Sequence, residues 1–235
     1  MYLSQHSADS IRLKEAPVRI IVGDNNDSGP KETFFIDAGA LRQGGSFFST
    51  ALKKQWKEGQ EGCIELPEEE AWIFGLYAQW LYTGKFFSKS NGEEDTANES
   101  DTLCKLYALG EVVMDRVFQD RTLDALYASI SDPENPVYLP GANSVNYICQ
   151  ETPSDSPARR LLLDLVVRCC SRRADWPAFL DKVNHAFLAD VVLAMADNRP
   201  ITGSNLPEAY TRKTGCRYHH HPKDQSCPAV QPHGV

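Results

Sequence analysis

The sequence predicts an α+β fold, in which a small sheet is flanked by helices and followed by a C-terminal helical extension. Two short runs rich in β-branched and aromatic residues come first, VRIIV at 18–22 and KETFFID at 31–37. A third short run, CIEL at 63–66, is followed by segments whose apolar residues recur at helical spacing. Strands that are followed by a series of helices are typical of α+β domains.

The first two runs predict a β-hairpin. Residues 18–22 end at the sequence GDNNDSGP, whose glycine, asparagine and aspartate residues favour turns. Residues 1–16 are polar and irregular, so we expect a flexible arm ahead of the hairpin. After the second run we expect a short helix near 38–43. Another should begin around Ser46 and bury the two phenylalanines that follow it.

The strongest helical signal runs from Pro67 to Gly84. Proline suits the first position of a helix, and the three glutamates that follow suit the positive end of the helix dipole. Glycine is common just beyond a helix C-terminus, so we expect the helix to end before Gly84. The apolar positions at helical spacing are Ile73, Phe74, Leu76, Tyr77, Trp80 and Leu81.

The acidic segment 88–101, SKSNGEEDTANESD, contains no aliphatic side chain larger than alanine, so we expect a flexible loop there. Two packed helices should follow and close a first domain that covers 17–130. Residues 131–142 contain three prolines and read as a linker or an ordered turn.

A helical extension is predicted for 143–196. Ser156 suits a helix N-cap and the proline after it suits the first helical position. In that helix the polar residues other than Arg159 fall four apart on one narrow stripe, so most of its surface should be buried. A last helix is expected from about Pro177 to Ala196. Residues 201–235 lose periodicity, and we expect a disordered tail.

Composition excludes several classes of function. The net charge of -8 argues against general affinity for nucleic acid or anionic membranes, because both need a basic surface. No apolar run approaches the roughly 18 residues that span a bilayer. No secretory signal is evident, and the seven cysteines are scattered, so we expect reduced thiols in the cytoplasm or the nucleus.

No catalytic motif stands out in the sequence. There is no Walker loop, dinucleotide-binding glycine pattern, nucleophile elbow or HExxH sequence, so we expect neither an enzyme nor a cofactor. An unrecognised enzyme is the alternative, and it would need a polar pocket with perturbed ionisable groups. His185 follows Asp181 by four residues, but no nucleophile accompanies them, so we interpret the pair as a surface contact.

Histidine and cysteine gather near the C-terminus. This set lacks a CxxC pair and falls in the expected disordered tail, whereas zinc sites need four ligands on a folded frame. We therefore expect no structural metal, and non-specific metal binding by the histidine run is the alternative. The residues are Cys216, His219, His220, His221 and Cys227.

Three stretches of this chain resemble BTB/POZ domain proteins. FFIDAGALRQGGSFF at 34–48 resembles the strand and following helices of the family, and WLYTG at 80–84 is similar to the end of the family's third long helix. NYICQETPSDSPARRLLLDLV at 146–166 resembles a C-terminal segment of BTB proteins from filamentous fungi. The resemblance covers residues 17 to 196 and implies the BTB/POZ fold.

The chain departs from the family at three places. Asp37 stands where the family usually has histidine, and Gly45 stands where it usually has serine. Residues 1–16 show no sign of the long N-terminal helix that many animal members exchange between subunits. The last departure argues against an intertwined dimer of that type.

The resemblance implies a protein-interaction module that mediates homo- or hetero-oligomerisation. It also implies a sharper alternative, because adaptors of cullin-3 ubiquitin ligases carry a hydrophobic-x-Glu sequence eight residues beyond the last aromatic of their Phe-Phe pair. Here that position holds Trp56, Lys57 and Glu58. Trp56 would be an exposed apolar anchor and Glu58 an orienting charge.

The simpler interpretation is that Trp56 covers the edge of the core and Glu58 is solvated. No kelch, MATH, ankyrin or zinc-finger substrate reader is evident in the sequence. In an adaptor of this kind, the helical extension or the tail would therefore have to recruit the substrate.

Overall fold

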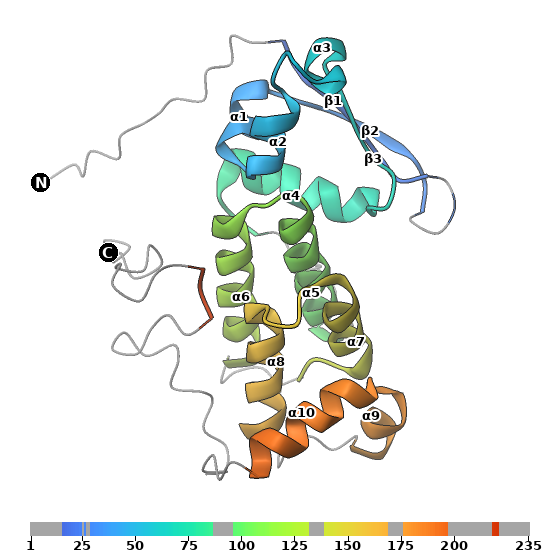
Figure 1. Cartoon of the computed structure of the whole chain (residues 1–235), viewed down its shortest axis with the longest axis vertical. Coiled ribbons are helices and arrows are strands. Elements are labelled where there is room, and N and C mark those ends of the chain that lie inside the picture. Colours follow the sequence, from blue (N-terminus) through green and yellow to red (C-terminus); the bar gives the residue numbers. More distant parts are fainter. Residues whose placement is uncertain are drawn as a thin grey trace, which may run out of the picture. The chain divides into compact units, whose positions relative to one another are not determined.

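The computed structural model describes residues 16–24, 26, 29–86, 96–131, 139–168, 176–196 and 218–220, and its elements are drawn in Figure 1. The fold is mixed α+β, as the sequence predicts. In chain order the elements are β1 (Val18–Val22), β2 (Glu32–Ile36), α1 (Ala38–Gln43), α2 (Ser46–Ala51), α3 (Lys57–Glu61), β3 (Cys63–Leu66), α4 (Ala71–Thr83), α5 (Thr96–Val112), α6 (Arg116–Ser131), α7 (Ala142–Glu151), α8 (Pro157–Arg168), α9 (Trp176–Lys182) and α10 (His185–Ala196).

The three strands form one sheet in the order β2-β1-β3. β1 pairs with β2 in an antiparallel hairpin, which confirms the predicted pairing of these two runs, and it pairs with β3 in parallel. Ile20 lies opposite Phe34 of one neighbour and Ile64 of the other. Val18, Ile20 and Val22 are all buried, because alternate residues of a strand point to the same face.

Contacts divide the chain into two compact units. The first contains β1 to α4 together with residues 109–115, and the second contains residues 88–108 and the chain from residue 116 onward. This division differs from the expected domain 17–130, since α6 and most of α5 group with the C-terminal helices. Hydrogen bonds within the second unit show why: Ser144 of α7 donates to Asp101 of α5, and Ser156 donates to Tyr107 of α5 at 3.2 Å.

The expected acidic loop 88–101 is wrong from residue 96 onward, because α5 begins at Thr96. Glu99 in its first turn suits the positive end of the helix dipole. Ser100 is buried, and Asp101 accepts the hydrogen bond from Ser144. A tertiary contact therefore supports helix in a stretch whose composition favours a loop. Residues 87–95 lie outside the described part of the chain.

The single helix expected from Pro177 to Ala196 is instead two helices, α9 and α10. Asn184 breaks the helix by capping α10, since its side-chain oxygen accepts from the N–H of Ala186 at 2.7 Å. The side chain of Asn146 of α7 stabilises the break between α9 and α10, because it accepts from the Asn184 N–H at 2.7 Å and donates to the Lys182 carbonyl at 2.8 Å. Asp181 and His185 therefore lie on different helices, and the expected contact within one helix does not apply.

Other predictions fall at the limits of the described residues. The expected arm 1–16 is described only at residue 16, and most of the expected tail 201–235 lies outside. Within that tail, residues 218–220 are placed, and Tyr218 is buried rather than disordered. None of the helices in the described part of the chain combines the length and apolar character needed to cross a bilayer.

Candidate functional site

The candidate site lies in the first unit, where the chain makes a tight turn between α2 and α3. The Trp56 N–H donates to the Lys53 carbonyl at 2.9 Å, and the Gln60 side chain donates to the Lys54 carbonyl at 3.0 Å. α3 folds back closely on this turn: a Cβ at Gly59 would lie only 2.3 Å from the Lys53 carbonyl oxygen. Glycine at 59 is therefore required by the turn, and the turn presents Trp56 at the start of α3.

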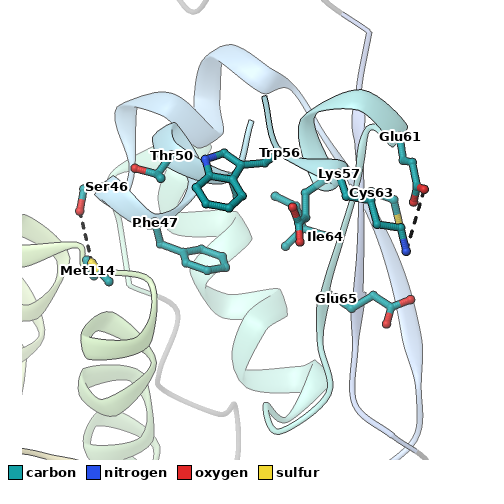
Figure 2. A pocket seen from close by; sticks show the side chains of 12 residues that line it. Ser46, Phe47, Thr50, Trp56, Lys57, Glu61, Cys63, Ile64, Glu65 and Met114 are labelled. Atoms are coloured by element: carbon teal, nitrogen blue, oxygen red, sulfur yellow. Dashed lines mark hydrogen bonds and ion pairs between the residues drawn. The ribbon is translucent and has the colours of Figure 1, made fainter. Parts of the chain in front are cut away.

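A cavity of about 430 Å³ opens between α2, α3 and β3 (Figure 2). Its apolar lining is Phe47, Ala51, Trp56, Ile64 and Met114. Its charged lining is Lys57, Glu58, Glu61 and Glu65. One lysine against three glutamates makes the lining acidic, so the cavity favours a partner that brings both an apolar group and a positive charge.

All three residues of the hydrophobic-x-Glu sequence line this cavity. Trp56 is 49% exposed and lies at the N-cap position of α3, with Lys57 and Glu58 in the first turn. Figure 2 shows the indole of Trp56 and the ring of Phe47 at the same cavity. The Lys57 ammonium lies 4.0 Å from Glu61, and both side chains are more than half exposed, so this ion pair adds little stability.

Phe47 differs from its expected burial. Phe48 is fully buried and stacks on Tyr77 with ring centroids 6.2 Å apart, whereas Phe47 is only half-buried and faces the cavity. The two rings also contact each other edge to face, with centroids 5.2 Å apart. The Phe-Phe pair is thus divided between the core and the cavity, as neighbouring residues of a helix point in different directions.

Met114 is a cavity residue that the sequence did not indicate. It follows α5 with a backbone φ of 55°, which is uncommon for a side chain other than glycine, and 59% of it is exposed. Its carbonyl accepts from the Ser46 N–H at 3.3 Å, and its sulfur accepts from the Ser46 hydroxyl at 3.6 Å. Residues 113–115, between α5 and α6, include no proline or glycine that would mark this turn in the sequence.

Gly45 explains one departure from the BTB pattern. A Cβ at this position would lie 1.7 Å from the Val113 carbonyl oxygen, so a serine does not fit here. The close approach lets the Phe47 N–H donate to the same carbonyl at 3.3 Å. The N–H of Gly45 itself donates to the Tyr77 hydroxyl at 3.3 Å.

Tyr77 and Asp115 stabilise the contact between residues 113–115 and the start of α2. Burial and the nearby Asp115 carboxylate raise the pKa of Tyr77 well above its ordinary value, so the hydroxyl remains protonated. It donates to Asp115 at 3.1 Å while accepting from Gly45. Residues 113–115 are therefore held against the start of α2, which positions Met114 at the cavity.

Asp37 explains the second departure. Its carboxylate caps α1 by accepting from the N–H groups of Gly39 and Ala40 at 2.8 and 3.2 Å. The Asp37 N–H donates to the hydroxyl of Tyr82 at 2.9 Å. Tyr82 belongs to the WLYTG stretch at 80–84, so that stretch is tied to the junction of β2 and α1.

The described residues contain no group of three or more histidine, cysteine, aspartate or glutamate side chains arranged to hold a metal ion. Of the five tail residues weighed as zinc ligands, only His219 and His220 are described, and their rings contact aspartates of α6. Cys216, His221 and Cys227 lie outside the described residues.

Comparison with known proteins adds no family to these observations. No protein-family model matches the chain, and a search of curated proteins finds no match. The similarity to BTB/POZ proteins therefore rests on the three sequence stretches quoted above.

Proposed function

We propose that this chain is a protein-interaction module of the BTB/POZ type that binds a segment of another protein in the Trp56 cavity. The supporting observation is that Trp56, Lys57 and Glu58 line one open cavity together with Phe47 and Met114. The order of elements from β1 to α6 is compatible with the fold that the resemblance implies. The alternative that Trp56 only covers the core edge is disfavoured by its 49% exposure.

The energy available to such an interface can be gauged from Trp56. A tryptophan buries on the order of 200 Å² when it is enclosed, so a half-exposed one leaves roughly 100 Å² for a partner to cover. At about 25 cal/mol per Å² this contributes about 2.5 kcal/mol, or roughly 50-fold in affinity. Glu58 would add orientation and association rate more than affinity.

The partner that the resemblance names is the N-terminal domain of cullin-3. In this form of the proposal the chain is a ubiquitin-ligase adaptor, with the Trp56 cavity docking the scaffold and the helical unit free to take substrate. The acidic lining predicts that the docking segment of the scaffold carries a basic residue beside an apolar one.

The test is a quantitative binding measurement between the full chain and purified cullin-3 N-terminal domain. Trp56→Ala should weaken binding roughly 50-fold, and Trp56→Ala with Glu58→Lys should abolish it. Trp72→Ala is the matched control, because Trp72 is 50% exposed on α4 and does not line the cavity. No binding by the wild-type chain would refute the adaptor, and equal losses in the two tryptophan variants would refute the cavity as its interface.

Self-association is the second candidate function, favoured by the sheet edge. β2 pairs only with β1 in the described sheet, and Phe35 on this strand is 68% exposed. Exposed edge strands with apolar side chains are common sites for pairing with another chain. Light scattering should then report a dimer mass that Phe35→Ser reduces to the monomer, and a monomeric wild type would refute this candidate.

A further inference from the structure

A short segment near the C-terminus, Tyr218–His220, packs against the second unit (red in Figure 1). Tyr218 is 1% exposed, and its hydroxyl donates to the Asp164 carboxylate of α8 at 2.5 Å. Asp164 is also 1% exposed, and a buried carboxylate needs hydrogen-bond donors to offset the water that it loses. Tyr218 thus covers the predicted polar stripe of α8 at Asp164. Its hydroxyl donates the hydrogen bond that offsets part of the hydration lost by the buried carboxylate.

The two histidines of the segment contact two carboxylates of α6. His219 Nε2 lies 3.0 Å from Asp124, and His220 Nδ1 lies 2.8 Å from Asp120. The backbone N–H of His220 also donates to the Asp120 carboxylate at 3.1 Å. Asp120 and Asp124 are four residues apart on one helix, so their side chains face the same way. Each histidine contact becomes an ion pair when the imidazole is protonated.

These contacts define an acidic face, made of Asp120 and Asp124 of α6 and Asp164 of α8. The three carboxylates of this face contact three consecutive residues. Asp164 accepts from the Tyr218 hydroxyl, Asp124 contacts the His219 imidazole, and Asp120 contacts the His220 imidazole. The aromatic ring is enclosed, and the two imidazoles are held at hydrogen-bond distance by carboxylates on a single helix. Enclosed aromatic anchors beside oriented charges are the usual basis for recognising a short peptide segment.

We propose that the acidic face is a docking site for a peptide segment with a tyrosine followed by two basic residues. In this proposal Tyr218–His220 is a competitor built into the chain, and a partner segment of the same chemistry binds by displacing it. This face shares no residue with the Trp56 cavity, so the inference is independent of the function proposed above.

How strongly Tyr218–His220 competes with a free peptide depends on the length of chain that connects it to the second unit. Residues 197–217 connect α10 to the docked segment. A ligand joined to its site through the same chain acts at an effective concentration on the order of 1 mM when the connection is short, and a longer connection lowers this value. A free peptide at micromolar concentration therefore competes poorly with the wild-type chain, and it gains access when the contacts of the tethered segment are removed.

The experiment uses the full chain and a fluorescein-labelled peptide with the sequence of residues 213–224 and Cys216→Ser. Fluorescence anisotropy measures its binding to the wild type and to a variant with alanine at 218, 219 and 220. The variant should bind the peptide at least about ten-fold more tightly than the wild type does. A peptide with alanine at the same three positions is the matched control and should bind neither protein.

Two further variants keep the test decisive. Adding Asp164→Asn to the triple variant should weaken peptide binding at least about five-fold, because the charged acceptor of the tyrosine hydroxyl is lost. Tyr218→Phe changes a single oxygen atom and should give an intermediate affinity, so it replaces the triple variant if circular dichroism shows that the triple variant is unfolded. Equal peptide binding by the wild type and the variants, or none by a folded variant up to about 1 mM, would overturn the proposal.

Discussion

The contact between Gly45 and Val113 provides a test in which structure and family pattern disagree. BTB proteins usually have serine at this position, so the resemblance alone would predict that Gly45→Ser is harmless or stabilising. The structure predicts the opposite, because a Cβ would lie 1.7 Å from the Val113 carbonyl oxygen. Contacts of side-chain carbons with backbone oxygen are rarely shorter than 3 Å, so α2 and residues 113–115 would have to separate by more than an ångström.

The cost can be worked from the hydrogen bonds that this separation breaks. The N–H groups of Ser46 and Phe47 donate across the contact to the carbonyls of Met114 and Val113, both at 3.3 Å. Each such bond contributes about 1 kcal/mol, and forcing an extra atom into a packed site costs about 1–3 kcal/mol more. We therefore expect Gly45→Ser to lower the free energy of unfolding by about 4 kcal/mol.

The assay is urea unfolding followed by tryptophan fluorescence, which reports on the first unit through Trp56, Trp72 and Trp80. Gly141→Ser is the matched control, because Gly141 is also a helix N-cap in extended conformation and a Cβ there meets nothing within 4 Å. That serine should leave stability unchanged or raise it by a few tenths of a kcal/mol. A Gly45→Ser variant within about 0.5 kcal/mol of the wild type would refute the close approach and the position of Met114 that depends on it.

Three further outcomes are expected. Burial and the neighbouring Asp101 raise the pKa of Cys104, so the folded state keeps this proton while the unfolded state releases it above about pH 8.5. The free energy of unfolding should therefore fall by about 1 kcal/mol between pH 8.5 and 9.5, and by less in the Cys104→Ala variant. In mass spectrometry, iodoacetamide should modify Cys104 only after unfolding, and alkylation in the native protein would contradict its burial. Asn184→Ala removes the cap of α10 and should cost about 1 kcal/mol in thermal unfolding, whereas exposed Asn143→Ala should cost under about 0.5 kcal/mol.

The sequence by itself determined those parts of the fold that depend on neighbouring residues. The hairpin follows from turn-forming residues between two β-branched runs, and the short helix at 38–43 is present as predicted. α4 ends before Gly84 because the glycine favours the conformation that stops a helix. Trp56, Lys57 and Glu58 were selected by the resemblance to cullin-3 adaptors, and the three residues line the same cavity.

Tertiary structure decided the features that join residues far apart in the sequence. Gly45 must be glycine because Val113 approaches it, and no local pattern reports that distance. The break between α9 and α10 depends on Asn146 of another helix, so apolar periodicity alone suggested one continuous helix. Asp164 lies on the polar stripe of α8, which helical periodicity alone assigns to solvent, and in the structure Tyr218 covers it. In each case the local structure is decided by the energy of a contact between residues that are tens of positions apart in the sequence. Helical or strand periodicity carries no information about such contacts.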